Sequence, residues 1–205
     1  YYTRCLEARE RLLGPEHPAT LTTAYILADL MSQQKRHDEA ISLRRRELTW
    51  CRKQNGDTDP GTLTSINDLA IDLRETSALE EAEALFRELV AGRQQVLEPE
   101  DFQIGRALGG LAKTLELAGK LEEALDYSQQ ALDHRLKHEG PDSWWTNREW
   151  LDLAMVIHKL GRLSEAQALV QELQDSMSRN SEPDDDDRKL LNEAEELLRS
   201  IEEST

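Results

Sequence analysis

The chain has 205 residues, a length that suits one compact domain or one run of repeats. Its 41 Asp and Glu against 25 Lys and Arg leave a formal net charge of −16, which argues against a surface for nucleic acid or an anionic membrane, because phosphates are bound by clustered cations. Hydrophobic residues make up 38% of the chain and aromatic residues only 5%, a ratio that suits thin layers of packed helices better than one thick core.

The first predicted element is a helix over residues 1–13, which reads as the second helix of a preceding repeat and suggests an excerpt of a longer chain. The segment "LGPEHPATLTT" predicts the start of the next helix, and its pattern of glycine, proline and threonine recurs 42 residues later in "NGDTDPGTLTS". The residue expected to begin the helix recurs at that interval as His17, Asp59, Asp101 and Ser143. The last three are good N-caps, because their side chains accept hydrogen bonds from free backbone amides. Pro18 and Pro60 come next, at the first helical position, where a missing N–H costs nothing.

Two small-residue positions recur with the same period. One is occupied by Ala28, Ala70, Ala112 and Ala154, and the other by Ala40, Ala82, Ala124 and Ala166. Two helices of a hairpin can cross closely only where neither carries a bulky side chain. The 42-residue period therefore predicts four repeats of two helices each, at residues 14–55, 56–97, 98–139 and 140–180.

A last helix is predicted over residues 184–203. Its apolar residues, among them Leu190, Ala194 and Leu197, form one face, which would cover the last repeat as a capping helix. The acidic run 184–187 favours a helix N-terminus. A calcium site is the alternative, but the run lacks the spaced ligands and glycine turn of an EF-hand.

This pattern resembles the tetratricopeptide repeat (TPR). The resemblance is carried by the paired alanines, by Gly119 and Gly161 between them, and by the aromatic Phe86 four residues after the second alanine. The period of 42 residues is similar to that of the kinesin-light-chain subtype. The resemblance implies an all-α, right-handed superhelix of antiparallel helix pairs. It also implies a protein- or peptide-binding module, such as the recognition or regulatory arm of a larger signalling or sensor protein.

The resemblance implies that the first helices line a concave groove. The groove residues most suited to contact a partner are Tyr25, Asp29, Asn67, Ile71, Arg74, Arg106, Gly109, Lys113, Arg148, Leu151, Met155 and Lys159. In the kinesin-light-chain pattern asparagines precede "LA" and hold a peptide backbone, and here only Asn67 keeps that place.

Charge and glycine content single out the C-terminal half of this groove. Arg106, Lys113, Arg148 and Lys159 form a cationic cluster, which favours a partner with an acidic segment or a terminal carboxylate. Gly109 and its neighbour Gly110 are unusual inside a helix. They indicate either close approach of a partner backbone or tight packing between helices.

Nothing in the sequence indicates catalysis, a metal or a cofactor. No nucleophile–base set or phosphate loop appears, and the pair His134 and His138 lacks a third ligand at a motif-like spacing. Cys5 and Cys51 are too few for a disulfide framework. The longest apolar run has five residues, so we expect a cytoplasmic protein without a membrane span.

Two alternatives stay open. Trp144 and Trp145, expected in a loop, could anchor a partner or fill the gap between repeats. Trp150 falls at a consensus aromatic position and is expected in the core. An architectural or self-associating scaffold, without a dedicated peptide groove, is the alternative function.

Overall fold

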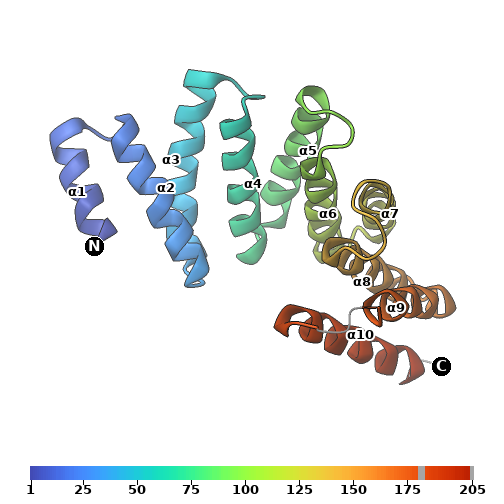
Figure 1. Ribbon diagram of the computed structural model, residues 1–205. Helices are drawn as coiled ribbons and strands as arrows, with labels where there is room; N and C mark the ends of the chain where they lie inside the picture. The colour runs from blue at the N-terminus through green and yellow to red at the C-terminus, as the bar shows by residue number, and fades with distance from the viewer. Residues whose placement is uncertain (180–182, 204–205) are drawn as a thin grey trace. The chain divides into compact units, whose positions relative to one another are not determined.

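The computed structural model describes residues 1–179 and 183–203, and helices account for about four fifths of them (Figure 1). Residue 180, the last of the fourth predicted repeat, lies outside the described residues. The helices are α1 (Tyr2–Leu13), α2 (Pro18–Gln33), α3 (His37–Asn55), α4 (Pro60–Glu75), α5 (Leu79–Val96), α6 (Phe102–Leu117), α7 (Leu121–His138), α8 (Trp144–Lys159), α9 (Leu163–Met177) and α10 (Asp185–Glu203). No strand occurs in these ranges, and the all-α helical-repeat class is confirmed.

The four first helices begin where the recurring pattern predicted. His17, Asp59, Asp101 and Ser143 are the N-caps of α2, α4, α6 and α8, and each side chain accepts a hydrogen bond from a backbone amide. Asp59 Oδ1 accepts from the amides of Gly61 and Thr62 at 2.9 and 3.3 Å. Such caps satisfy amides that have no partner inside the helix. Trp144 and Trp145 are therefore the first two residues of α8, and the expectation of a loop there is wrong.

The turn between paired helices needs a left-handed residue in every repeat. Lys35, Ser77, Gly119 and Gly161 occupy this place at 42-residue intervals, with φ of 63°, 62°, 75° and 75°. Glycine adopts positive φ without steric cost, whereas other residues pay for it. The first two repeats thus carry a less favourable turn residue than the last two.

Both alanine series lie at crossings of helices. Ala112 is 3% exposed and the other seven are fully buried. Because no larger side chain intervenes, each first helix packs closely against the second helix of its repeat. Trp150 is buried in the core, as expected.

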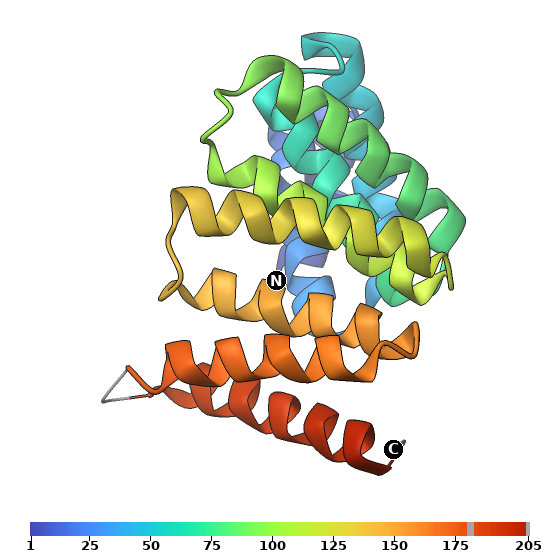
Figure 2. The ribbon, with the colours of Figure 1, turned by 90° about the vertical axis from the view of Figure 1, so that its right-hand side faces the viewer.

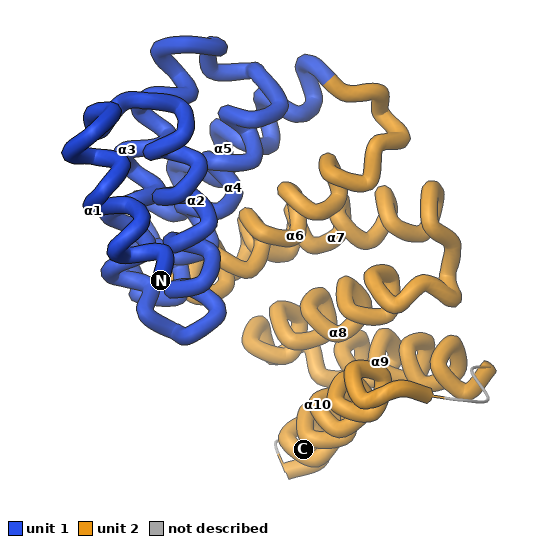
Figure 3. The backbone as a smooth tube through the Cα atoms, turned by 60° about the vertical axis from the view of Figure 1, so that its left-hand side comes forward, with its two compact units in different colours: residues 1–96 blue, residues 97–205 orange. Residues whose placement is uncertain are grey.

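The chain divides into two compact units, residues 1–96 and 97–205 (Figure 3). In the first, Leu6, Leu27 and Met31 belong to a core cluster shared by α1, α2 and α3. In the second, α7, α8, α9 and α10 follow one another in successive layers (Figure 2).

Helix α10 covers the end of the second unit. Leu190, Ala194, Leu197 and Ile201 are buried in one cluster with apolar residues of α8 and α9, which confirms the capping helix. Asp184 Oδ1 accepts from the amides of Asp186 and Asp187 at 2.9 Å each, so this carboxylate serves as a helix cap. None of the helices described is long and apolar enough to cross a bilayer.

Candidate functional site

In the first unit several of the expected groove residues are engaged by other side chains of the chain. Asn67 is buried, and its amide donates to Asp68 Oδ1 at 3.1 Å. The Tyr25 hydroxyl donates to the other oxygen of Asp68 at 3.4 Å. Asp29 is exposed, whereas Ile71 and Arg74 are half-buried, with the Arg74 guanidinium over the ring of Phe86. Asn67 is therefore poorly placed to hold a peptide backbone unless it leaves Asp68.

A buried polar network in the first unit was not anticipated from the sequence. The guanidinium of Arg44, 4% exposed, donates to Asp72 Oδ2 at 2.6 Å and to Asp68 Oδ2 at 3.1 Å. Asp72 is 1% exposed and also lies 2.7 Å from Nδ1 of His37. A buried ion pair persists only where hydrogen bonds satisfy both partners, and here they do.

The alignment of the repeats contained an indication of this network. Position 44 is equivalent to Phe86, Ser128 and Val170 in the later repeats, and all three are buried. A charged residue at such a place requires a buried counter-ion. Sequence reasoning missed Arg44 because it considered charges only on the first helices.

In the second unit three of the four members of the predicted cationic cluster are in ion pairs within the chain. Lys113 and Lys159 contact the two oxygens of Glu116 at 2.7 and 2.8 Å. Although burial alone would raise the pKa of Glu116, hydrogen bonds from these two lysines bring it below its usual value. The patch around Glu116 is thus an internally neutralised network.

Arg148 is held from two sides. It contacts Asp152 at 2.9 Å and Glu193 of α10 at 2.6 Å, so it ties the capping helix to α8. Arg106 is exposed and makes no ion pair with the described residues. Only this member of the expected cluster is available as a free cation.

Two further residues expected in the groove, Leu151 and Met155, pack against the core of the second unit. Leu151 is fully buried and belongs to the core of the second unit, so its assignment to a partner-contacting surface is wrong. The resemblance to the tetratricopeptide repeat placed Leu151 in the groove, but packing covers that position. Met155 is half-buried against the same core.

Gly109 is explained by packing between helices. A Cβ at this position would lie 2.6 Å from Glu149 Oε1 of α8, so the missing side chain makes room for a carboxylate. Of the two readings of this glycine, close packing is the one that the structure supports. Burial, and then the negative charge of Asp152, raise the pKa of Glu149 to about 8, against the opposing effect of Arg135 and Arg148.

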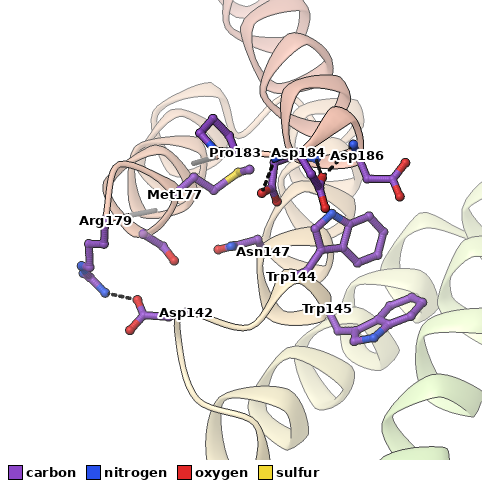
Figure 4. Close-up of a pocket in the computed structure, with 11 residues that line it drawn as sticks. Asp142, Trp144, Trp145, Asn147, Met177, Arg179, Pro183, Asp184 and Asp186 are labelled. Carbon is purple, nitrogen blue, oxygen red and sulfur yellow. Dashed lines mark hydrogen bonds and ion pairs between the residues drawn. The ribbon is translucent and has the colours of Figure 1, made fainter. Parts of the chain in front are cut away.

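A pocket of about 600 Å³ opens where α8 begins, α9 ends and α10 begins (Figure 4). Trp144, Asn147 and Met177 surround it, and an ion pair between Arg179 and Asp142 lies at its edge. Trp145, also in the lining, is 51% exposed. We call this cavity the tryptophan pocket.

The tryptophan pocket contains two buried polar atoms without hydrogen-bond partners among the described residues. One is the indole nitrogen of Trp144, a donor, and the other is Oδ1 of Asn147, an acceptor. Leaving such an atom unpaired costs about 1–3 kcal/mol. Among its buried atoms the pocket therefore has one unpaired donor and one unpaired acceptor.

The histidine pair is used locally. The His134 and His138 rings lie 4.7 Å apart, and His134 Nε2 is 3.0 Å from the carbonyl oxygen of Pro99. Across the described residues no group of three His, Cys, Asp or Glu side chains is placed to hold a metal ion.

Comparison with known proteins identifies the repeat. The sequence profile described as Tetratricopeptide repeat matches residues 1–46, 27–95 and 73–137, which together cover more than half of the chain. The chain belongs to the tetratricopeptide-repeat family. No curated protein matches this TPR chain.

Solved structures show the same fold for the TPR chain. A Podosopora anserina kinesin light chain with nearly identical TPR-like repeats is 20% identical, with a TM-score of 0.77, over 89% of this chain and 86% of that one. Its single-substitution variant is 21% identical, with a TM-score of 0.78, over 87% and 84%. BtubC (BKLC) from P. vanneervenii is 16% identical, with a TM-score of 0.71, over 99% and 87%. The kinesin-light-chain-like form of the repeat is confirmed.

Proposed function

We propose that this TPR chain is a protein- or peptide-binding module rather than an enzyme, and that it serves as the recognition arm of a larger cytoplasmic signalling or sensor protein. TPR repeats are generally protein–protein interaction modules. The proposal gives the recognition role to a defined place, the tryptophan pocket.

The observation that carries the proposal is the pair of unpartnered atoms in that pocket. Trp144 has an indole N–H to donate, and Asn147 has a carbonyl oxygen that accepts. A peptide unit carries the complementary pair, a carbonyl that accepts and an N–H that donates. An extended segment of a partner would satisfy both atoms through its main chain.

Trp145 supplies the apolar part of the same site. Its ring is half-exposed, packs edge-on against Trp144 with centroids 4.8 Å apart, and lies under the guanidinium of Arg135 at 5.4 Å. A rigid, exposed aromatic side chain is a common anchor of interfaces. This arrangement favours an apolar partner side chain beside the main-chain contacts.

The test is selection of displayed 12-residue random peptides on the 205-residue chain, followed by fluorescence anisotropy of the selected peptides. Trp144→Phe and Asn147→Leu remove the donor and the acceptor. Both replacements already occur at equivalent positions, Phe102 and Leu63, so the repeat tolerates them. We expect the affinity of each variant to fall about fivefold or more, since a lost hydrogen bond is worth about 1 kcal/mol or more.

Phe102→Ala is the matched control, because it removes an aromatic side chain that is 55% exposed at the start of α6. It should leave binding unchanged. Equal affinity of the two pocket variants and the wild type would overturn the assignment of the site. Failure to select any peptide would count against peptide recognition itself.

An acidic partner segment is the finer hypothesis from the sequence. Its support is now limited to Arg106, because Lys113, Lys159 and Arg148 are already neutralised within the chain. A partner carboxylate at this patch would therefore pair with Arg106. Loss of binding of an acidic peptide in Arg106→Gln would support it.

Self-association remains the second candidate, and exposed apolar side chains favour it. Leu12 of α1 is 73% exposed, and Phe102 and Leu117 of α6 are 55% and 49% exposed. Light scattering across a range of protein concentrations tests it. A constant monomer mass would exclude a self-associating scaffold in that range.

A further inference from the structure

A second pocket, of about 340 Å³, lies within the first unit between α2, α3 and α4. Its lining is Pro18, Leu21, Thr22, Tyr25, Glu47, Trp50, Cys51, Gly61, Thr64 and Ser65. Two of these residues are aromatic, and Glu47 is the only one with an ionised side chain at neutral pH. We call it the Glu47 pocket.

The carboxylate of Glu47 is only half satisfied. Oε1 accepts a hydrogen bond from the Ser65 hydroxyl at 3.2 Å, whereas Oε2 is buried and has no partner among the described residues. Burial raises the pKa of Glu47 to about 6, although the Ser65 hydrogen bond and the charge of Arg44 oppose the rise. A carboxylate with an unpaired, desolvated oxygen gains free energy when a cation approaches it.

The neighbouring cation does not fill this role. Arg44 donates its hydrogen bonds to Asp72, Asp68 and Ser32, and no ion pair joins it to Glu47. Oε2 of Glu47 is therefore open to a cationic group from outside the chain.

We propose that the Glu47 pocket receives a lysine or arginine side chain of the bound partner, whose cationic head pairs with the Glu47 carboxylate. The inference rests on the proposed function, because it takes the cation from a polypeptide. The rings of Tyr25 and Trp50 line the pocket with the carboxylate, and aromatic faces attract cations while accommodating their apolar stems. Charge complementarity thus selects a basic side chain over an apolar or acidic one.

The nearest cation lies outside the lining of the Glu47 pocket: the Arg44 guanidinium is 5.9 Å from the centroid of the Tyr25 ring and is bound by Asp72 and Asp68. The lining contains no Lys, Arg or His, and Asp68 and Asp29 add negative charge on the adjoining first helices, as their upward effect on the pKa of Tyr25 shows. Burial is the largest cause of the raised Tyr25 pKa, and the negative charge of Asp68 is the second. An anionic partner group would be repelled.

Nuclear magnetic resonance of the tryptophan indole N–H groups tests the proposal. The Trp50 signal is assigned by its loss in Trp50→Phe. The chain is then titrated with N-acetyl-alanyl-lysyl-alanine amide, its arginyl counterpart, its uncharged norleucyl counterpart, and butylammonium. We expect at least one basic peptide to shift the Trp50 signal with a Kd five or more times lower than that of the norleucyl peptide.

The variant Glu47→Gln should abolish this preference, whereas Asp38→Asn should keep it. Asp38 is an exposed acid on the same helix, so its removal changes the net charge equally. Equal binding of norleucyl and basic peptides, or a preference that survives Glu47→Gln, would overturn the inference. Butylammonium binding as tightly as both basic peptides would assign the pocket to a free amine and overturn the partner side chain.

Failure here is distinguishable from failure of the proposed function. The variants that test the tryptophan pocket lie in the other unit and use separate peptides. If binding of those peptides depends on Trp144 and Asn147 while the Glu47 pocket binds basic and norleucyl peptides equally, only this inference fails.

Discussion

The carboxylate of Glu149 in α8 occupies the space that a side chain at Gly109 in α6 would need. The distance from Oε1 to an added Cβ would be 2.6 Å, and Glu149 is only 8% exposed. Its nearest cation, Arg135, lies 3.9 Å away. The glycine therefore admits a buried acid that is incompletely compensated, with consequences for stability.

Glu149→Gln should stabilise the protein increasingly as pH rises. The pKa of Glu149 is raised in the folded chain from its ordinary 4.5 to about 8, so the folded state holds a proton that the unfolded state releases. The wild type therefore loses stability between those two values, whereas glutamine does not titrate. Near pH 8 the variant should be more stable by a few kcal/mol, and near pH 4.5 this pH-dependent advantage should vanish.

Urea unfolding at several pH values measures this difference. Glu195→Gln, at an exposed position of α10, is the control and should show no such trend. A stability difference independent of pH would show that Glu149 is ionised in the folded protein.

Ser77→Gly should stabilise the first unit, and Lys35→Gly should do the same. Both residues hold positive φ at a turn where later repeats use glycine, and a non-glycine residue there costs about 1 kcal/mol or slightly more. Part of the gain is offset by the larger entropy of glycine in the unfolded chain. Gly119→Ala, at the equivalent turn, should be destabilising.

Thermal melting of the three variants gives the comparison. A melting temperature that falls for Ser77→Gly and rises for Gly119→Ala would reverse the expected order. Such a result would mean that side-chain contacts, rather than backbone conformation, decide the stability of this turn.

Arg44→Phe should destabilise the protein by about 3–5 kcal/mol, because it leaves the buried carboxylate of Asp72 without its cation. The double variant Arg44→Phe with Asp72→Leu removes both charges. Phe86 and Leu30, at the equivalent positions of other repeats, show that the repeat accepts these residues. The double variant should therefore be clearly more stable than the sum of the two single changes predicts.

A complete cycle of urea melts measures the coupling between the two positions. Strict additivity of the two changes would mean that the ion pair contributes no coupling energy. Arg45→Met, on the same helix but exposed, serves as the control and should cost little.

Ala112→Leu should cost roughly 1–3 kcal/mol by overpacking a helix crossing. Ala112 is 3% exposed in α6, so a larger side chain must displace its neighbours. Ala84→Leu, at an exposed position of α5, should change the melting temperature little. Equal melting temperatures of the Ala112→Leu variant and the wild type would show that the crossing can relax around the added volume.

The sequence alone determined where the repeats begin and which positions pack between helices. Caps such as Asp59 act on amides two or three residues away, so their effect is local and can be read from spacing. The alanines recur with the repeat because each crossing has the same geometry. Both the caps and the alanines recur every 42 residues, so they can be recognised without knowledge of tertiary contacts.

Only the tertiary structure decided which charges and pockets are available to a partner. Lys159 reaches Glu116 from the next repeat, and Arg148 reaches Glu193 from the capping helix, so neither is the free cation that its own helix suggested. Likewise the open oxygen of Glu47 appears only once Ser65 is packed against it. Spacing along one helix fixes the direction of a side chain, but these contacts are made with residues 18 to 45 positions away, whose rotamers and distances are set by packing.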